Sequence, residues 1–151
     1  MVAALSAVVL SAAPTLAKHP GITVTGSWSQ TIGTVNLASG AGSDLANPYA
    51  SSSSQLVLDI NGTTGNGNSY VTVQRVDTSW NSNLNLYVQR TSGGSNVSGG
   101  TTYLLVTTSA QTFFTETQDV TVNVQVKLDG VSLQVPPATY ATGLLFTVIQ
   151  P

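Results

Sequence analysis

Cysteine is absent from the 151 residues, and basic side chains are scarce. Without cysteine the chain can form neither a disulfide framework nor a thiolate metal site. Lysine and arginine together number four, which is too few to build the positive surface that binds phosphates. We therefore expect no nucleic-acid partner and no tightly bound transition metal.

Charge of either sign is rare: only 7% of the residues are charged, against roughly 25% in a typical soluble domain. The polar surface must then come largely from neutral groups, and the chain has 18 serines and 21 threonines. Such a surface gains little solubility from charge repulsion. The composition therefore favours association of the chain with itself.

Residues with catalytic potential are equally few. His19 is the single histidine, and nothing in the sequence places it beside a nucleophile. No spacing pairs two carboxylates across a cleft, as glycoside hydrolysis requires. The stretch from Asp59 to Asn68 offers oxygen ligands for calcium, but it lacks the glutamate that closes an EF-hand loop, so a glycine- and asparagine-rich hairpin loop is favoured. We predict that the chain is not an enzyme and has no cofactor and no metal site.

Residues 1–17 form an apolar run of small residues, leucine and valine that ends in Thr15-Leu16-Ala17. This pattern is typical of a secretory signal and predicts cleavage before Lys18, although no basic residues precede it. The run is short for a bilayer span and is interrupted by Pro14. The alternative is a retained N-terminal segment that packs into a core or docks. The signal interpretation predicts a secreted or cell-surface protein whose mature form, residues 18–151, is a single domain without a membrane span.

Apolar and polar residues alternate with period two through much of residues 18–151, which is typical of half-buried strands. The clearest run is Val120–Leu128, and the same pattern recurs at Leu56–Ile60 and Leu84–Val88. The segment Tyr140–Ile149 is apolar on both parities toward its end, which predicts burial on both faces. The spacing predicts an all-β, antiparallel β-sandwich of about seven to nine strands.

Asp129-Gly130 lies between two apolar runs and predicts a tight hairpin, because a type I′ turn needs positive φ at its central residues. We therefore expect Val120–Leu128 to pair with Val131–Val135. Pro136-Pro137 would end the second strand, since proline cannot donate to a ladder.

Aromatic residues support an alternative function, a secreted carbohydrate-binding β-sandwich module with polysaccharide as its partner. Tyr87 has the parity opposite to Leu84, Leu86 and Val88, so it is expected to face outward. Trp28 shares its parity with Ile22 and Val24, which favours a place in the core. The aromatic side chains available for stacking on sugars are Trp28, Trp80, Tyr49, Tyr70, Tyr87, Tyr103 and Tyr140.

The C-terminal segment Val135-Pro136-Pro137-Ala138-Thr139-Tyr140, followed by Leu144-Leu145-Phe146-Thr147-Val148, resembles the closing strand of pilin-like and spore-coat-type β-sandwich subunits. The resemblance covers about the last fifteen residues specifically and the rest only in composition. It implies an immunoglobulin-like fold that polymerises by donor-strand complementation, in which a neighbour's strand fills a missing one. The cysteine pair of many such pilins is absent here.

The segment Gly21–Ile32 has the features of such a donor, since it follows the expected cleavage site and alternates with large apolar residues. Its assembly residues would be Ile22, Val24, Trp28 and Ile32. The same segment could equally be the first strand of its own sheet. The sequence therefore predicts a homopolymer, the structural subunit of an extracellular filament, pilus or fimbria, or of a surface layer, joined by β-strand addition.

Overall fold

The computed structural model describes residues 3–9, 20–63 and 68–151, and for residues 3–9 it describes the backbone. These residues form twelve strands and two short 3₁₀ helices, and nine of the strands have five or more residues. In the part of the chain described, no helix is long and apolar enough to cross a bilayer. The strands are β1 (Ala3–Val9), β2 (Gly21–Thr25), β3 (Trp28–Ile32), β4 (Tyr49–Ala50), β5 (Leu56–Asn61), β6 (Ser69–Ser79), β7 (Asn85–Arg90), β8 (Val97–Ser98), β9 (Leu104–Leu105), β10 (Gln111–Glu116), β11 (Val120–Asp129) and β12 (Thr139–Ile149).

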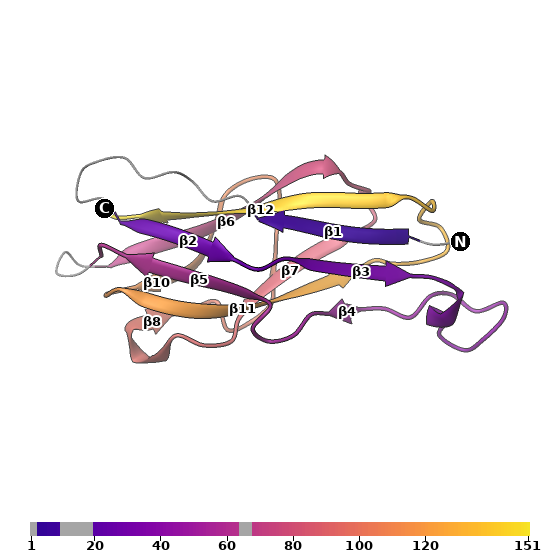
Figure 1. Ribbon diagram of the computed structural model, residues 1–151, viewed down its shortest axis with the longest axis horizontal. Helices are drawn as coiled ribbons and strands as arrows, with labels where there is room; N and C mark the ends of the chain where they lie inside the picture. Colours follow the sequence, from indigo (N-terminus) through magenta and orange to yellow (C-terminus); the bar gives the residue numbers. More distant parts are fainter. Residues whose placement is uncertain (1–2, 10–19, 64–67) are drawn as a thin grey trace.

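The strands form an elongated sandwich of two sheets, which confirms the predicted all-β class (Figure 1). The first sheet has the order β3-β1-β12-β6-β10-β8. The second has the order β2-β5-β11-β7-β9, and β4 also pairs with β11. The ladders are antiparallel except that between β1 and β12, which is parallel.

The core lies between the sheets and is built from the inward parity of each strand. Along β11 the even-numbered residues from Val122 to Leu128 are 0–1% exposed, while the residues between them are half-buried. The alternating runs of β5 and β7 bury one face in the same way. The period-two pattern therefore predicted these strands and their inward faces correctly.

Two expectations about pairing and burial are wrong. Both sides of β11 are occupied, by β5 and β7, so Val131–Val135 cannot pair with it. That segment instead crosses from the second sheet to β12 in the first, with Val131 and Val135 buried on the way. In β12 only one parity is buried, and Ile149 is 49% exposed, so the strand is not buried on both faces.

Candidate functional site

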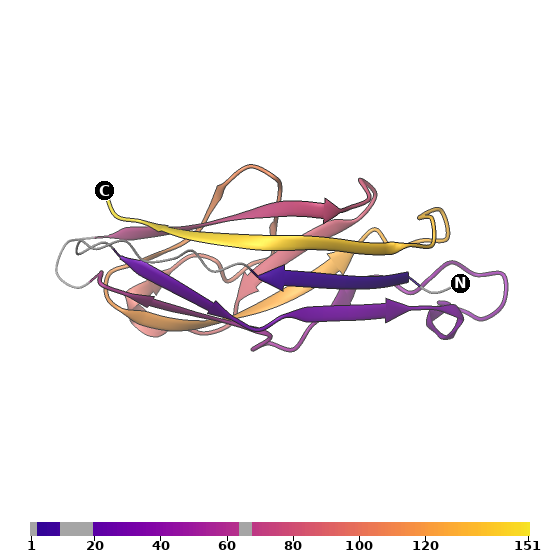
Figure 2. The same cartoon turned by 45° about the horizontal axis from the view of Figure 1, so that its top comes forward.

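The strand β1, taken from the N-terminal apolar stretch, lies in the first sheet between β3 and β12 (Figures 1 and 2). It runs antiparallel to β3, with Ala3 opposite Ile32 and Ala7 opposite Trp28. It runs parallel to β12, with six register pairs from Ala4–Thr139 to Val9–Leu144. The expected signal segment therefore includes a strand that is bonded on both sides.

The two neighbours of β1 differ in how much of their strand pairing β1 supplies. β12 also pairs along its length with β6, whereas β3 is the edge of the sheet and pairs with β1 alone among the described strands. Without a strand in the position of β1, the facing backbone N–H and C=O groups of β3 and β12 would lose their partners. Several register neighbours of that position are buried: the core residues Trp28, Ile32, Tyr140 and Leu144, and the polar residue Thr142.

The predicted donor segment Gly21–Ile32 is divided between the two sheets of its own chain. β2 pairs with β5 at the edge of the second sheet, and β3 pairs with β1 at the edge of the first. Gly26 joins them with φ +108°, and a Cβ there would lie 2.2 Å from the Gln55 carbonyl oxygen. Only glycine fits at this position, where the chain passes from the second sheet to the first.

The four assembly residues accordingly fall into two pairs. Ile22 and Val24 on β2 are half-buried against the core, opposite Ile60 and Leu58. Trp28 and Ile32 on β3 are 8% and 5% exposed and belong to the core itself. Whether any of them enters a second copy stays a prediction.

An apolar pocket of about 80 Å³ lies at the end of the sandwich where β3 ends and β12 begins. Its walls come from both sheets and from the crossing segment after β11, and they include Ile32, Leu84, Leu128, Val131 and Tyr140. Ile32 and Tyr140 are register neighbours of Ala3 and Leu5 of β1. The pocket is therefore next to the start of β1.

The aromatic residues are spread over the molecule and form no single platform. Trp28 and Tyr140 are buried, and the Tyr140 hydroxyl donates to the Pro136 carbonyl oxygen at 2.6 Å. Tyr87 faces outward as predicted, and the Lys127 ammonium lies 4.4 Å from its ring centroid and 4.4 Å from that of Tyr103. The Arg75 guanidinium lies 4.6 Å from the Trp80 ring, and Tyr70 stands on β6 in the first sheet.

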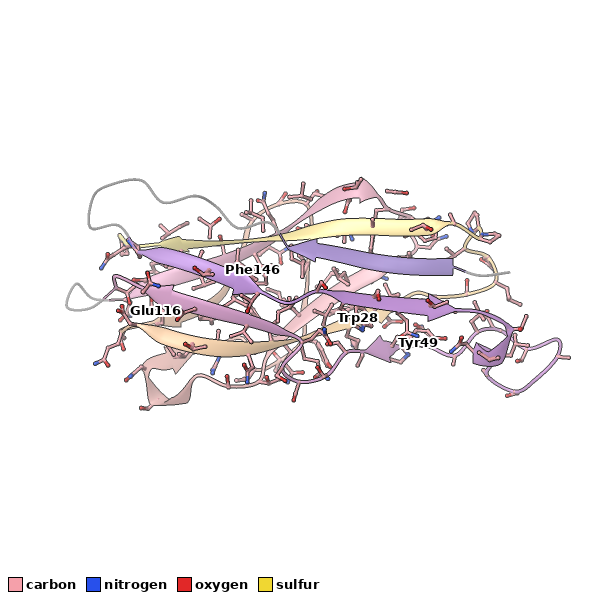
Figure 3. The ribbon with its side chains drawn as sticks, in the orientation of Figure 1. Trp28, Tyr49, Glu116 and Phe146 are labelled. Carbon is pink, nitrogen blue, oxygen red and sulfur yellow. The ribbon has the colours of Figure 1, made fainter. Side chains whose placement is uncertain are left out.

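An oxygen-rich cluster, which sequence reasoning did not find, is formed by Thr63, Ser69, Glu116 and Asp119. The Thr63 hydroxyl lies 3.1 Å from Glu116 Oε2 and 3.1 Å from Asp119 Oδ1, and the Thr63 N–H donates to Asp119 Oδ1 at 2.9 Å. Ser69 is directly opposite Glu116 in the ladder between β6 and β10. Figure 3 shows Glu116 toward one end of the molecule, away from Tyr49.

The described residues contain no group of three or more histidine, cysteine or acidic side chains able to hold a metal ion. The cluster above has two carboxylates and two hydroxyls, so it falls outside that definition. His19, the expected cleavage site and residues 64–67 of the calcium-like stretch lie outside the described residues. Asp59 itself is exposed on β5, where it accepts a hydrogen bond from the Thr121 hydroxyl at 3.1 Å.

Comparisons of the sequence with family models and with curated proteins, and of the fold with solved structures, found no match.

Proposed function

We propose that the chain is the structural subunit of an extracellular filament or surface layer, and that its copies join by β-strand addition. The observation that carries this proposal is the position of β1 between β3 and β12. Cleavage before Lys18 would remove β1 and leave β3 and β12 about two strand spacings apart, near 10 Å. A strand from a second copy would then complete the sheet.

β2 is the part of the predicted donor that is best suited to this role. Among the described strands it pairs with β5 alone, and once residues 1–17 are removed only three residues precede it. In the position of β1 the same backbone would be bonded on both sides. The exchange therefore adds a second ladder, while Trp28 and Ile32 stay behind as one wall of the acceptor.

The composition supports the same proposal. With four basic and six acidic side chains, two copies meet little electrostatic repulsion. Each copy has one donor and one acceptor, which are different surfaces, so the contact is head-to-tail and extends into an open chain of subunits wherever its rotation does not close a ring.

The test uses the full chain, expressed for secretion and recovered from the medium. We expect intact mass to give an N-terminus at Lys18, and electron microscopy to show filaments or sheets. A processed chain that stays a monodisperse monomer at high concentration would contradict the structural role. A secreted chain that retains Met1 would contradict the proposed opening of the sheet.

A disulfide that locks β2 to β5 tests the donor. Thr23 and Asp59 are register partners and both are exposed, so T23C/D59C holds β2 in its own sheet. The matched control D59C/T121C links β5 to β11 through the register pair Thr121–Asp59 and leaves β2 free. We expect the oxidised T23C/D59C protein to lose assembly and to regain it on reduction, while the control assembles in both states. Equal assembly of both oxidised proteins would show that β2 is not the donor.

The outward face around Tyr87 favours a second candidate, the binding of polysaccharide. Tyr87 and Tyr103 flank Lys127, so two aromatic rings and an ammonium group lie together on the outer face of the second sheet. Gel retardation in neutral polysaccharides tests this candidate, with Tyr87→Ala as the variant. Retarded wild-type monomer and unretarded variant would favour the binding module over the filament.

A further inference from the structure

We propose that Thr63, Ser69, Glu116 and Asp119 form a binding site for a hard divalent cation of the Ca²⁺ type. The site is independent of how copies of the chain assemble. Three observations about these four side chains support the proposal.

The first observation is the burial of an acidic group without an ion pair. Glu116 is 1% exposed, at the end of β10, and Thr115 separates it from the buried pair Phe113 and Phe114. Among the described residues its carboxylate makes no salt bridge, since the one ion pair found joins Arg75 and Asp77 at 2.7 Å. A buried carboxylate is costly unless a positive charge or several hydrogen bonds compensate it.

The second observation is the geometry around the Thr63 hydroxyl. Its oxygen lies 3.1 Å from one oxygen of Glu116 and 3.1 Å from one oxygen of Asp119. A hydroxyl carries a single proton and can donate it to only one of them. Thr63 therefore brings one oxygen of Glu116 and one oxygen of Asp119 to the same point, and a cation would offset the repulsion between the two carboxylates.

The third observation is a pair of buried oxygens that have no hydrogen-bond partner among the described residues. These are Glu116 Oε1 and Ser69 Oγ, and Ser69 is 0% exposed. The two residues are opposite each other in the antiparallel ladder, so their Cβ atoms are roughly 5 Å apart on the same side of the sheet. Both side chains therefore point to the same region, next to the oxygens bound by Thr63.

The chemistry of the coordinating atoms decides which class of ion the site would bind. Every candidate group is an oxygen, from two carboxylates and two hydroxyls, which suits Ca²⁺ or Mg²⁺ and does not suit softer metals. Asp119 is exposed while the other three side chains are buried, so the ion can enter from solvent on the side of Asp119 and keep some of its water. The site joins the end of β5, the start of β6, the end of β10 and the start of β11, and so links both sheets.

The experiment measures thermal unfolding of the full chain after treatment with a chelator, with and without added CaCl2 in the millimolar range. A ligand at about a hundred times its Kd is expected to raise Tm by roughly 5 °C or more for a domain of this size. Tb³⁺ luminescence provides a second readout of an oxygen-lined site, and excess Ca²⁺ should quench it. Mg²⁺ in place of Ca²⁺ shows which size of ion the site accepts.

Three variants separate the site from general effects on stability. Asp119→Asn changes an exposed side chain and should weaken Ca²⁺ binding at least tenfold while the protein stays folded. Glu116→Gln should abolish the Ca²⁺-dependent shift in Tm. Asp77→Asn is the control, because Asp77 pairs with Arg75 and lies outside the cluster, and its Ca²⁺ shift should equal that of the wild type.

Two results would overturn the proposal. One is a wild-type Tm that does not respond to Ca²⁺ or Mg²⁺, together with an unchanged or higher Tm for Glu116→Gln, since this would mean that a proton or a buried water satisfies the cluster. The other is a Ca²⁺ response that survives in both Asp119→Asn and Glu116→Gln, since the ion would then bind elsewhere.

Discussion

Gly130 shows how a correctly interpreted residue can belong to a wrongly predicted element. Its φ is +81°, as the Asp-Gly pattern predicted, and Asp129 Oδ1 accepts a hydrogen bond from its N–H at 2.7 Å. The turn nevertheless leads out of the second sheet, not into a hairpin. The local dipeptide determines the backbone conformation, whereas the partner of the next segment depends on packing far away in sequence.

The variant Gly130→Val should be strongly destabilised. A Cβ at Gly130 would lie 1.9 Å from the Asn83 carbonyl oxygen, and a β-branched residue at positive φ adds strain. We expect the free energy of unfolding to fall by about 3 kcal/mol or more. Gly42→Val is the control, because Gly42 has φ +88° but no atom within 4 Å of its Cβ position. Equal losses in the two variants, measured by urea unfolding, would show that the contact with Asn83 is relieved at no cost.

Tyr49 carries a buried hydroxyl that has no hydrogen-bond partner among the described residues. Tyr49→Phe should therefore raise the free energy of unfolding by about 1 kcal/mol at neutral pH. Tyr103→Phe should lower it by about 1 kcal/mol, because the Tyr103 hydroxyl donates to Gln125 Oε1 at 2.9 Å. A loss of stability in both variants would mean that the Tyr49 hydroxyl is hydrogen-bonded in solution.

Burial also raises the pKa of the Tyr49 phenol above its ordinary value. The unfolded chain then loses this proton at a lower pH than the folded chain, so Tyr49 lowers stability as the pH rises above about 10. The wild type should consequently lose stability more steeply than Tyr49→Phe in that range. Parallel unfolding curves from pH 9 to 11, measured for both proteins, would contradict the assignment.

Among the elements, strand faces were predictable from the sequence and strand partners were not. The parity of Leu56, Leu58 and Ile60 predicted a buried face without any knowledge of the neighbouring strands. β1 was missed because small residues, leucine and valine suit a signal segment and a strand alike. Glu116 was missed because its carboxylate gave no sign that it follows the inward parity of β10.

Arg90 holds the end of β7 to the segment that carries β8. Its side chain is 8% exposed and donates to the carbonyl oxygens of Ser92, Val97 and Gly99. Burial lowers the pKa of its guanidinium, which remains charged at neutral pH. The planar group reaches three acceptors at once, and a lysine ammonium on a flexible stem does not.

Arg90→Lys should therefore lower the free energy of unfolding by about 2 kcal/mol or more. Amide exchange should speed up first in the segment from Ser92 to Gly100. Lys127→Arg, on the outer face of the same sheet, is the control and should change stability by no more than about 0.5 kcal/mol. Equal effects of the two substitutions would show that the three carbonyl contacts of Arg90 add nothing specific.

For the whole molecule, the low charge predicts how the proposed assembly responds to salt. The net charge is −2, and strand addition depends on hydrogen bonds and apolar contacts. The assembled fraction should change less than about twofold between roughly 0.01 and 0.1 M salt, where the Debye length falls from about 30 to 10 Å. Sedimentation at several salt concentrations measures this fraction. A steep dependence would indicate an interface built on ion pairs.

The parallel ladder between β1 and β12 has a mechanical consequence. β1 begins at one end of the elongated molecule and β12 finishes at the other, so a pull that separates the two strand ends acts along both strands in opposite directions (Figure 1). Force applied in this way loads the six register pairs together instead of opening them one after another. Under tension the first sheet should therefore resist rupture as a shear clamp. A donor strand that lies parallel to β12 in this position would transmit load between subunits in the same way.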